Sequence, residues 1–199
     1  MLRLAAGRRW AHVPVALALL AVAASRAAAQ ALEPPGPWVV DLRGATSGLP
    51  SDTAFYPPLS AETLVPSRAF GFDAGAHVYL FTLGPARIGL GASYLRVRGT
   101  TPGVTATFST VAPQVSFNFG STNGWSYLSA GYGRALVDTT VDDPTGSVRD
   151  SGSLGAVNFG GGARWFIRAH LGVGFDVRWH RLASPGGTQL SFSAGFSVH

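Results

Sequence analysis

The sequence contains no cysteine and no lysine, and only 13% of its 199 residues are charged. Without cysteine the chain can form neither a disulfide framework nor a thiolate metal site. The 15 basic residues are all arginine, and the pI near 10.4 would by itself suggest a nucleic-acid partner. Four of these arginines, however, lie in an N-terminal segment that we expect to be removed. That leaves 11 arginines against 10 acids, a net charge near +1 that gives no reason to expect nucleic acid.

This N-terminal segment, residues 1–29, has the three parts of a secretory signal peptide. Three arginines precede an apolar run over residues 10–24, and three alanines form a small-residue cleavage site before Gln30. The alternative is a transmembrane anchor, but the run is shorter than the roughly 20 residues that a spanning helix needs. We therefore predict a cleaved signal peptide over 1–29 and a short periplasmic lead-in over 30–37.

Two segments near the C-terminus, residues 157–167 and 171–180, alternate between apolar and polar side chains. Side chains of a strand point alternately to its two faces, so the segments are predicted to be two strands. A three-residue turn would place Ile167 opposite Leu171 and keep like faces together. Each large polar side chain would then face a glycine: Gly162 faces Asp176, Gly160 faces Arg178, and Gly174 faces Arg164.

The polar face of this hairpin is crowded, and its apolar face carries tryptophans, which is the arrangement of a barrel with lipid outside and charges inside. The same alternation recurs along the rest of the chain. Besides the two strands of the hairpin, strands are predicted at 38–45, 68–81, 87–98 and 125–137. One more strand is predicted to end at residue 119, and the last one at residue 198. We therefore predict an all-β fold, an eight-stranded antiparallel up-and-down transmembrane β-barrel over residues 38–199.

Three further expectations concern the connections. Residues 46–67 and the acidic segment 138–152 are predicted to be long surface loops. Along the chain, the predicted connections alternate between longer loops and short turns. Because the short turns of such barrels lie on the periplasmic side, both termini are expected to be periplasmic. A bulge at Tyr94–Leu95 is expected to turn Arg96 and Arg98 toward the lumen.

The predicted barrel resembles the small eight-stranded outer-membrane barrels of the OmpA/OmpX type over residues 38–199. The best-matching pieces are residues 127–133 (YLSAGYG), residues 175–178 (FDVR) and the last strand. Ser193, Gly195 and Val198 follow the frame of the family's C-terminal assembly signal, although Val198 is not aromatic and His199 follows it.

The resemblance implies a monomeric integral protein of the cell outer membrane of a Gram-negative-type bacterium, exported through its signal peptide. Outer-membrane lipids and lipopolysaccharide would surround it, with periplasmic chaperones and the barrel-insertion machinery as partners during assembly. No cofactor, metal, catalytic residue or nucleic acid is expected.

Two sets of residues are candidates for functional positions. A polar network is predicted to fill the lumen, and aromatic residues are predicted to form a girdle at each membrane interface. The predicted lumen set is Asp41, Arg43, Asp73, His77, Arg96, Arg98, Arg164, Asp176, Arg178 and His180. The predicted girdle is Trp38 and Trp165 at the periplasmic rim, with Phe70 and Trp179 at the outer rim.

The main prediction for function is a structural or surface-interaction barrel whose lumen is plugged by paired arginine and aspartate, because an eight-stranded barrel is only wide enough for its own side chains. A narrow, slightly cationic channel for small solutes is the alternative, with Arg96, Arg98 and Arg178 as its selectivity residues. A soluble lipocalin-like barrel with the opposite orientation of its faces is another.

Two further possibilities involve specific chemistry. A lipid A-modifying enzyme would need a nucleophile, a base and an acid in contact, and the local candidates are His180 beside Ser184 and His77 with Asp73. The loop aspartates could bind a divalent cation that bridges lipopolysaccharide phosphates, or could simply be solvated; they are Asp138, Asp142, Asp143 and Asp150.

Overall fold

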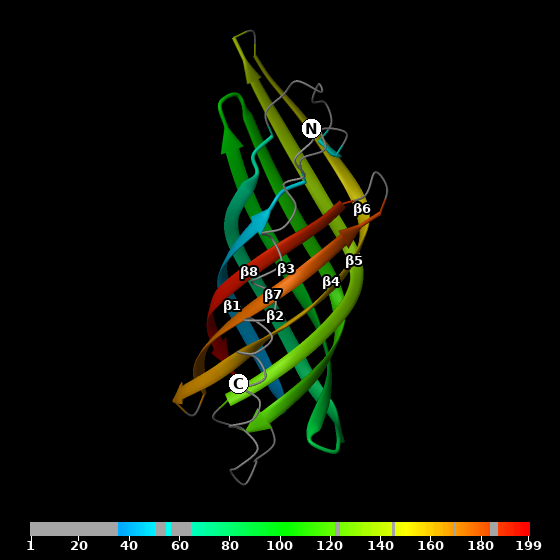
Figure 1. Cartoon of the computed structure of the whole chain (residues 1–199), viewed down its shortest axis with the longest axis vertical. Helices are drawn as coiled ribbons and strands as arrows, with labels where there is room; N and C mark the ends of the chain where they lie inside the picture. Colours follow the sequence, from blue (N-terminus) through cyan, green and yellow to red (C-terminus); the bar gives the residue numbers. More distant parts are fainter. Residues whose placement is uncertain are drawn as a thin grey trace, which may run out of the picture.

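In the computed structural model, the residues described are 36–50, 55–56, 65–121, 124–144, 146–168, 170–183 and 187–199. They form eight antiparallel strands in a closed ring, in which each strand pairs with the next and β8 pairs with β1 (Figure 1). The strands are β1 (Trp38–Gly48), β2 (Arg68–Leu83), β3 (Ala86–Thr101), β4 (Val104–Ser121), β5 (Gly124–Asp143), β6 (Gly146–Arg168), β7 (Leu171–Leu182) and β8 (Gly187–Val198). The predicted barrel is confirmed.

The predicted signal peptide and most of the lead-in, residues 1–35, lie outside the described residues. Within the described part of the chain, no helix has the length and apolar character needed to cross a membrane.

The strands are strongly tilted and staggered around the ring. Ser47 of β1 pairs with Ser191 of β8, and the row of paired residues continues through every strand to Tyr79 of β2. The Tyr79 N–H donates to the carbonyl of Pro37, 2.9 Å away, which precedes β1 itself. Followed once around the ring, the row therefore starts at Ser47, near one end of β1, and comes back beside Pro37, just before the other end of β1. A closed barrel of tilted strands requires such a stagger.

The two ends of the barrel differ. One end, which we call the turn end, holds the C-terminus and the junctions of β2 with β3, β4 with β5 and β6 with β7 (Figure 1). At the other, the loop end, lies the connection between β1 and β2, and the β5–β6 hairpin projects beyond the rim (Figure 1).

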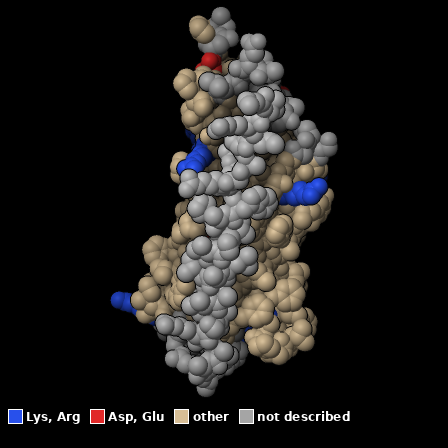
Figure 2. All heavy atoms as spheres, viewed as in Figure 1, with Lys and Arg blue, Asp and Glu red and all other residues tan. Residues whose placement is uncertain are grey.

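The outer wall is apolar. Along each strand exposed apolar side chains alternate with buried inward-facing ones, and leucine, valine and phenylalanine dominate the exposed set. On the face shown in Figure 2, charged side chains of the described residues lie toward the two ends of the barrel. The predicted girdle residues Trp38, Trp165, Phe70 and Trp179 all face outward, the first two near the turn end and the last two near the loop end.

The β6–β7 hairpin has the predicted pairing. Gly160 pairs with Arg178, Gly162 with Asp176, and Gly174 with Arg164. The glycines are required by space, since a Cβ on Gly162 would lie 1.9 Å from the carbonyl oxygen of Phe175. The prediction fails only at the turn, where a register shift places Arg168, not Ile167, opposite Leu171.

The structure corrects the expected bulge in β3. Pairing with both neighbours is regular through Tyr94–Leu95, and the register shift lies instead in β2, between Tyr79 and Phe81. Arg96 and Arg98 are therefore exposed on the outer wall, and the prediction that they line the lumen is wrong. The physical reason is that Leu95 and Val97, with exposed fractions of 3% and 1%, fill an apolar part of the lumen at this level.

The structure also corrects the predicted loop over residues 138–152. Nearly all of this segment is paired in β5 and β6, whose ladder continues to Asp143 and Gly146. β-Branched residues at 139–141 favour strands, which explains the extension. In the first predicted loop, β1 continues to Gly48, whereas residues 51–54 and 57–64 lie outside the described part.

Candidate functional site

The lumen is filled by three layers of side chains. A polar and charged layer lies in the middle, an aromatic layer lies at the turn end, and an apolar layer lies at the loop end. This middle layer contains three aspartates and three arginines that are all buried: Asp41, Asp73, Asp176, Arg43, Arg164 and Arg178. Their formal charges balance, which is what a desolvated set of ions requires.

Asp41 of β1 is the centre of the first charge cluster. Its carboxylate accepts two hydrogen bonds from Arg164 of β6, Nε to Oδ1 at 2.8 Å and Nη2 to Oδ2 at 2.6 Å. Ser197 of β8 donates a third at 2.6 Å, and Arg43 Nη2 lies 2.7 Å from Oδ1. Arg43 also donates to Asp73 at 3.1 Å. The cluster therefore joins four strands across the lumen.

Asp176 and Arg178 of β7 form a second cluster. Their side chains make two hydrogen bonds, Nε to Oδ1 at 3.1 Å and Nη2 to Oδ2 at 2.9 Å. Arg178 also donates to Asn158 and Ser129, and the Tyr127 hydroxyl donates to Asp176 at 2.8 Å. The Tyr127 ring links the clusters, because the Arg164 guanidinium carbon lies 3.8 Å from its centroid.

Neutral polar residues complete the middle layer. The Gln114 amide nitrogen donates to Ser93 and Asn158, each at 2.8 Å, and its oxygen lies 3.2 Å from His77 Nε2. His180 Nε2 lies 3.2 Å from the Ser191 hydroxyl. These contacts satisfy part of the hydrogen-bonding capacity of the buried amide, hydroxyl and imidazole groups.

The aromatic layer at the turn end is built from Val39, Tyr79, Trp125 and Phe166. The Trp125 ring contacts Tyr79 and Phe166, with centroids 5.6 and 4.8 Å apart. His199 packs beside them, 4.2 Å from Phe166 between centroids. These residues fill the lumen between the charged middle layer and the turn end.

The apolar layer at the loop end was not predicted from the sequence. It includes inward-facing Leu95, Val97 and Phe108, together with Phe55 and Tyr56 from the β1–β2 connection. Phe55 and Tyr56 have exposed fractions of 3% and 0%, and their rings meet edge to face at 5.2 Å. The alternation of the strands could have revealed the wall of this layer. Nothing in the surrounding proline-rich segment marks Phe55 and Tyr56 as buried.

Eight of the ten predicted lumen residues lie together in the middle layer: Asp41, Arg43, Asp73, His77, Arg164, Asp176, Arg178 and His180. Arg96 and Arg98 lie on the outer wall. The predicted lumen set lacks three buried residues that contact these charges: Ser129, Asn158 and Ser197.

The alternative chemical sites are not assembled among the described residues. His77 contacts Gln114 rather than Asp73, and Ser184 lies outside the described part. Asp138 lies 3.7 Å from Arg149, and Asp142 and Asp150 accept hydrogen bonds from Ser147 and the Ser151 N–H. Across the described ranges no three acidic or histidine side chains come together in a way that could hold a metal ion.

The model of the outer membrane protein beta-barrel domain family matches residues 15–199. The chain belongs to this family. It is an outer-membrane β-barrel, so the lipocalin-like alternative is wrong. No curated protein sequence matches the chain.

Among solved structures, this family member is similar to Ail, the attachment invasion locus protein of Yersinia pestis. The two are 12% identical with a TM-score of 0.55, over 83% of this chain and 99% of that one. It is also similar to Neisserial surface protein A, at 13% identity and a TM-score of 0.53, over 83% and 99% of the two chains. At this level of identity, the similarities show the fold.

Proposed function

We propose that this outer-membrane barrel is a closed structural and surface-interaction protein, not a conducting pore and not an enzyme. The single observation that carries the proposal is the continuous filling of the lumen. Three layers follow one another from Trp125 at the turn end, through the Asp41 cluster, to Phe55 and Tyr56 at the loop end. Solutes would have to displace paired buried charges, whose separation is costly.

The surface-interaction part of the proposal is supported by the shape of the loop end. The β5–β6 hairpin projects beyond the rim (Figure 1), and residues 146–151 on its β6 side are all exposed. Rigid scaffolds commonly carry function on such projecting segments. Proteins with the same fold are named as an attachment protein and a surface protein, which supports the same kind of role here.

The runner-up is a narrow channel for small anions, and two placements argue against it. Arg96 and Arg98 lie on the outer wall, and Arg178 is paired with Asp176. No unpaired cationic path therefore runs through the described part of the lumen.

Single-channel recording tests the proposal. Protein isolated from outer membranes would be inserted into planar bilayers, with insertion verified separately by the mobility shift between folded and heated protein. We expect stable insertion without discrete conductance steps. Replacing both Phe55 and Tyr56 by alanine should leave the barrel silent, because the middle layer remains closed. Reproducible steps from the unmodified protein would refute the closed lumen.

A further inference from the structure

The apolar layer at the loop end consists of a wall built by the strands and of two side chains that fill it. The wall includes inward-facing residues of β3, β4, β5 and β7, namely Leu95, Val97, Phe108, Val137 and Leu182. Its strands are fixed by their pairing around the ring, whatever the wall encloses. We call this wall the loop-end cup. Phe55 and Tyr56, which come from the connection between β1 and β2, are its occupants.

The occupants leave polar groups of the lumen unpaired. The Tyr56 hydroxyl is buried and has no hydrogen-bond partner among the described residues. Gln189 of β8 has an exposed fraction of 2%, and neither the nitrogen nor the oxygen of its amide has a partner in that part of the chain. Burying a polar group without a partner costs free energy. Phe55 and Tyr56 therefore match the apolar wall of the cup but not its polar atoms.

Gln189 belongs to a polar side of the loop-end cup. It pairs with His180 of β7, and the next inward-facing residue of β7 toward the loop end is Leu182 of the wall. The His180 ring also meets the ring of Phe108 edge to face, with centroids 6.1 Å apart, and its Nδ1 is a further buried atom without a described partner. Apolar walls with a few polar groups on one side are typical of small-molecule sites, which occur in the mouths of β-barrels.

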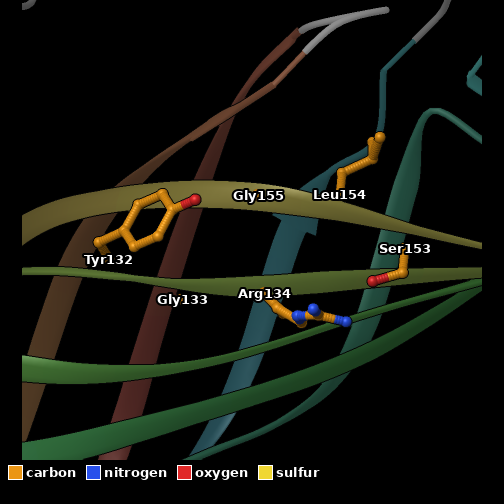
Figure 3. A pocket seen from close by; sticks show the side chains of 6 residues that line it. All are labelled: Tyr132, Gly133, Arg134, Ser153, Leu154 and Gly155. Carbon is orange, nitrogen blue, oxygen red and sulfur yellow. The ribbon is translucent and has the colours of Figure 1, made fainter.

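A different hollow lies on the outer surface of the barrel, between β5 and β6. This groove has a volume of about 560 Å³, and the side chains that line it include Tyr132, Arg134 and Ser153 (Figure 3). All three are exposed and face away from the lumen. Ligands in the groove and in the loop-end cup would consequently depend on different side chains, which allows the two places to be distinguished by mutation.

We propose that the loop-end cup binds a small uncharged molecule, an aromatic ring that carries a carboxamide group, in exchange with Phe55 and Tyr56. The ring of the ligand replaces their rings against the apolar wall. Its carboxamide can donate to and accept from the amide of Gln189, which matches both unpaired atoms. A charged ligand is excluded, because the cup offers no counter-ion and an unpaired buried charge is costly.

This site adds ligand binding to the closed surface barrel without requiring passage through it. The paired charges of the middle layer, with Asp41 and Arg164 at their centre, close the lumen on the turn-end side of the cup. Binding and conductance are therefore separate measurements, and a failure of one does not decide the other.

The test uses benzamide as the probe, with protein isolated from outer membranes and transferred to vesicles of deuterated phosphatidylcholine. Saturation-transfer NMR on the benzamide protons measures the dissociation constant. The unmodified protein should bind benzamide, and Phe55→Ala/Tyr56→Ala should bind it about tenfold more tightly, because no occupant has to leave. Gln189→Leu, which keeps the approximate size of the side chain, should weaken binding about tenfold in either protein by removing the amide partner.

The matched control is Tyr132→Ala, which removes an aromatic side chain from the outer groove and should leave the dissociation constant unchanged. Equal affinity of the unmodified protein and the Phe55→Ala/Tyr56→Ala variant would overturn the proposal, and so would loss of binding in Tyr132→Ala. Binding by the alanine variant alone would also overturn it, since the cavity would then be a product of the mutation. If the alanine variant does not fold, the comparison of Gln189→Leu with the unmodified protein decides: equal binding, or none in either, overturns the proposal.

Discussion

The carboxylate of Asp41 holds the guanidinium of Arg164 through two hydrogen bonds of 2.8 and 2.6 Å, although their strands, β1 and β6, are not neighbours in the ring. The pair is a brace across the lumen rather than a part of the wall. Both side chains have exposed fractions of 1%, so neither charge can be satisfied by bulk water. The interior charges are consequently a structural element of this barrel.

Replacing Asp41 by asparagine should therefore be strongly destabilising. The substitution keeps the shape of the side chain but leaves Arg164 and Arg43 without their shared counter-charge. We expect a loss of about 3–5 kcal/mol in the free energy of unfolding. Urea unfolding in lipid vesicles, followed by tryptophan fluorescence, would measure it.

The control for this prediction is the double-mutant cycle with Arg164→Gln. If the two groups stabilise each other, the double variant should lose less than the sum of the two single variants. Additive losses would show that the pair is not coupled.

Replacing Gly162 by alanine should also destabilise the barrel, for a steric reason. The added methyl group would lie 1.9 Å from the Phe175 carbonyl oxygen, a backbone atom that cannot move without distorting the β6–β7 ladder. We expect a cost of about 1–3 kcal/mol in the same unfolding measurement. Gly152→Ala on the same strand is the control, because no atom lies within 4 Å of its added methyl group. Equal costs at the two positions would contradict the steric explanation.

The absence of cysteine makes the orientation of β3 directly measurable. Single cysteines at 95, 96, 97 and 98 would be exposed to a water-soluble maleimide in detergent-solubilised folded protein. Arg96→Cys and Arg98→Cys should label rapidly, whereas Leu95→Cys and Val97→Cys should be protected until the barrel unfolds. The reverse labelling pattern would contradict the outward orientation of Arg96 and Arg98 and would support a bulge at Tyr94–Leu95.

Tyr56 gives a prediction for alkaline pH. Burial raises the pKa of its hydroxyl above the ordinary value. The stabilising contribution of the neutral phenol is therefore complete below the ordinary pKa of about 10 and is lost as pH rises from there toward the raised pKa of the folded state. Tyr56→Phe cannot ionise, so its stability should fall less between pH 9 and pH 11, a range chosen around that ordinary value. Identical pH profiles for the two proteins would contradict a buried Tyr56.

Much of the fold could be predicted because two simple signals agree in the C-terminal hairpin. The alternation of apolar and polar residues identifies the two faces of each strand. The placement of Gly160 opposite Arg178 identifies the register of the hairpin. Both signals are local and steric, so one sequence is enough to find them. The middle layer of the lumen follows from the same faces.

The incorrect predictions have other physical causes. The prediction for β3 assumed that a charged side chain must face the lumen, but a strand longer than the bilayer can place Arg96 and Arg98 outside, beyond the apolar band. Likewise, acidic residues around position 140 suggested a loop, although β-branched neighbours allow paired strands outside the membrane. The burial of Phe55 depends on contacts with distant strands, which no local pattern encodes.

The closed ring also determines the order in which stability can be acquired. Asp41 belongs to the first strand, and its partners Arg164 and Ser197 belong to the sixth and the last. A partly paired sheet that includes the strands only up to β5 lacks all of these cross-lumen contacts. They form only once β6 and β8 have joined the ring, which favours all-or-none assembly over stepwise growth of a half-formed sheet.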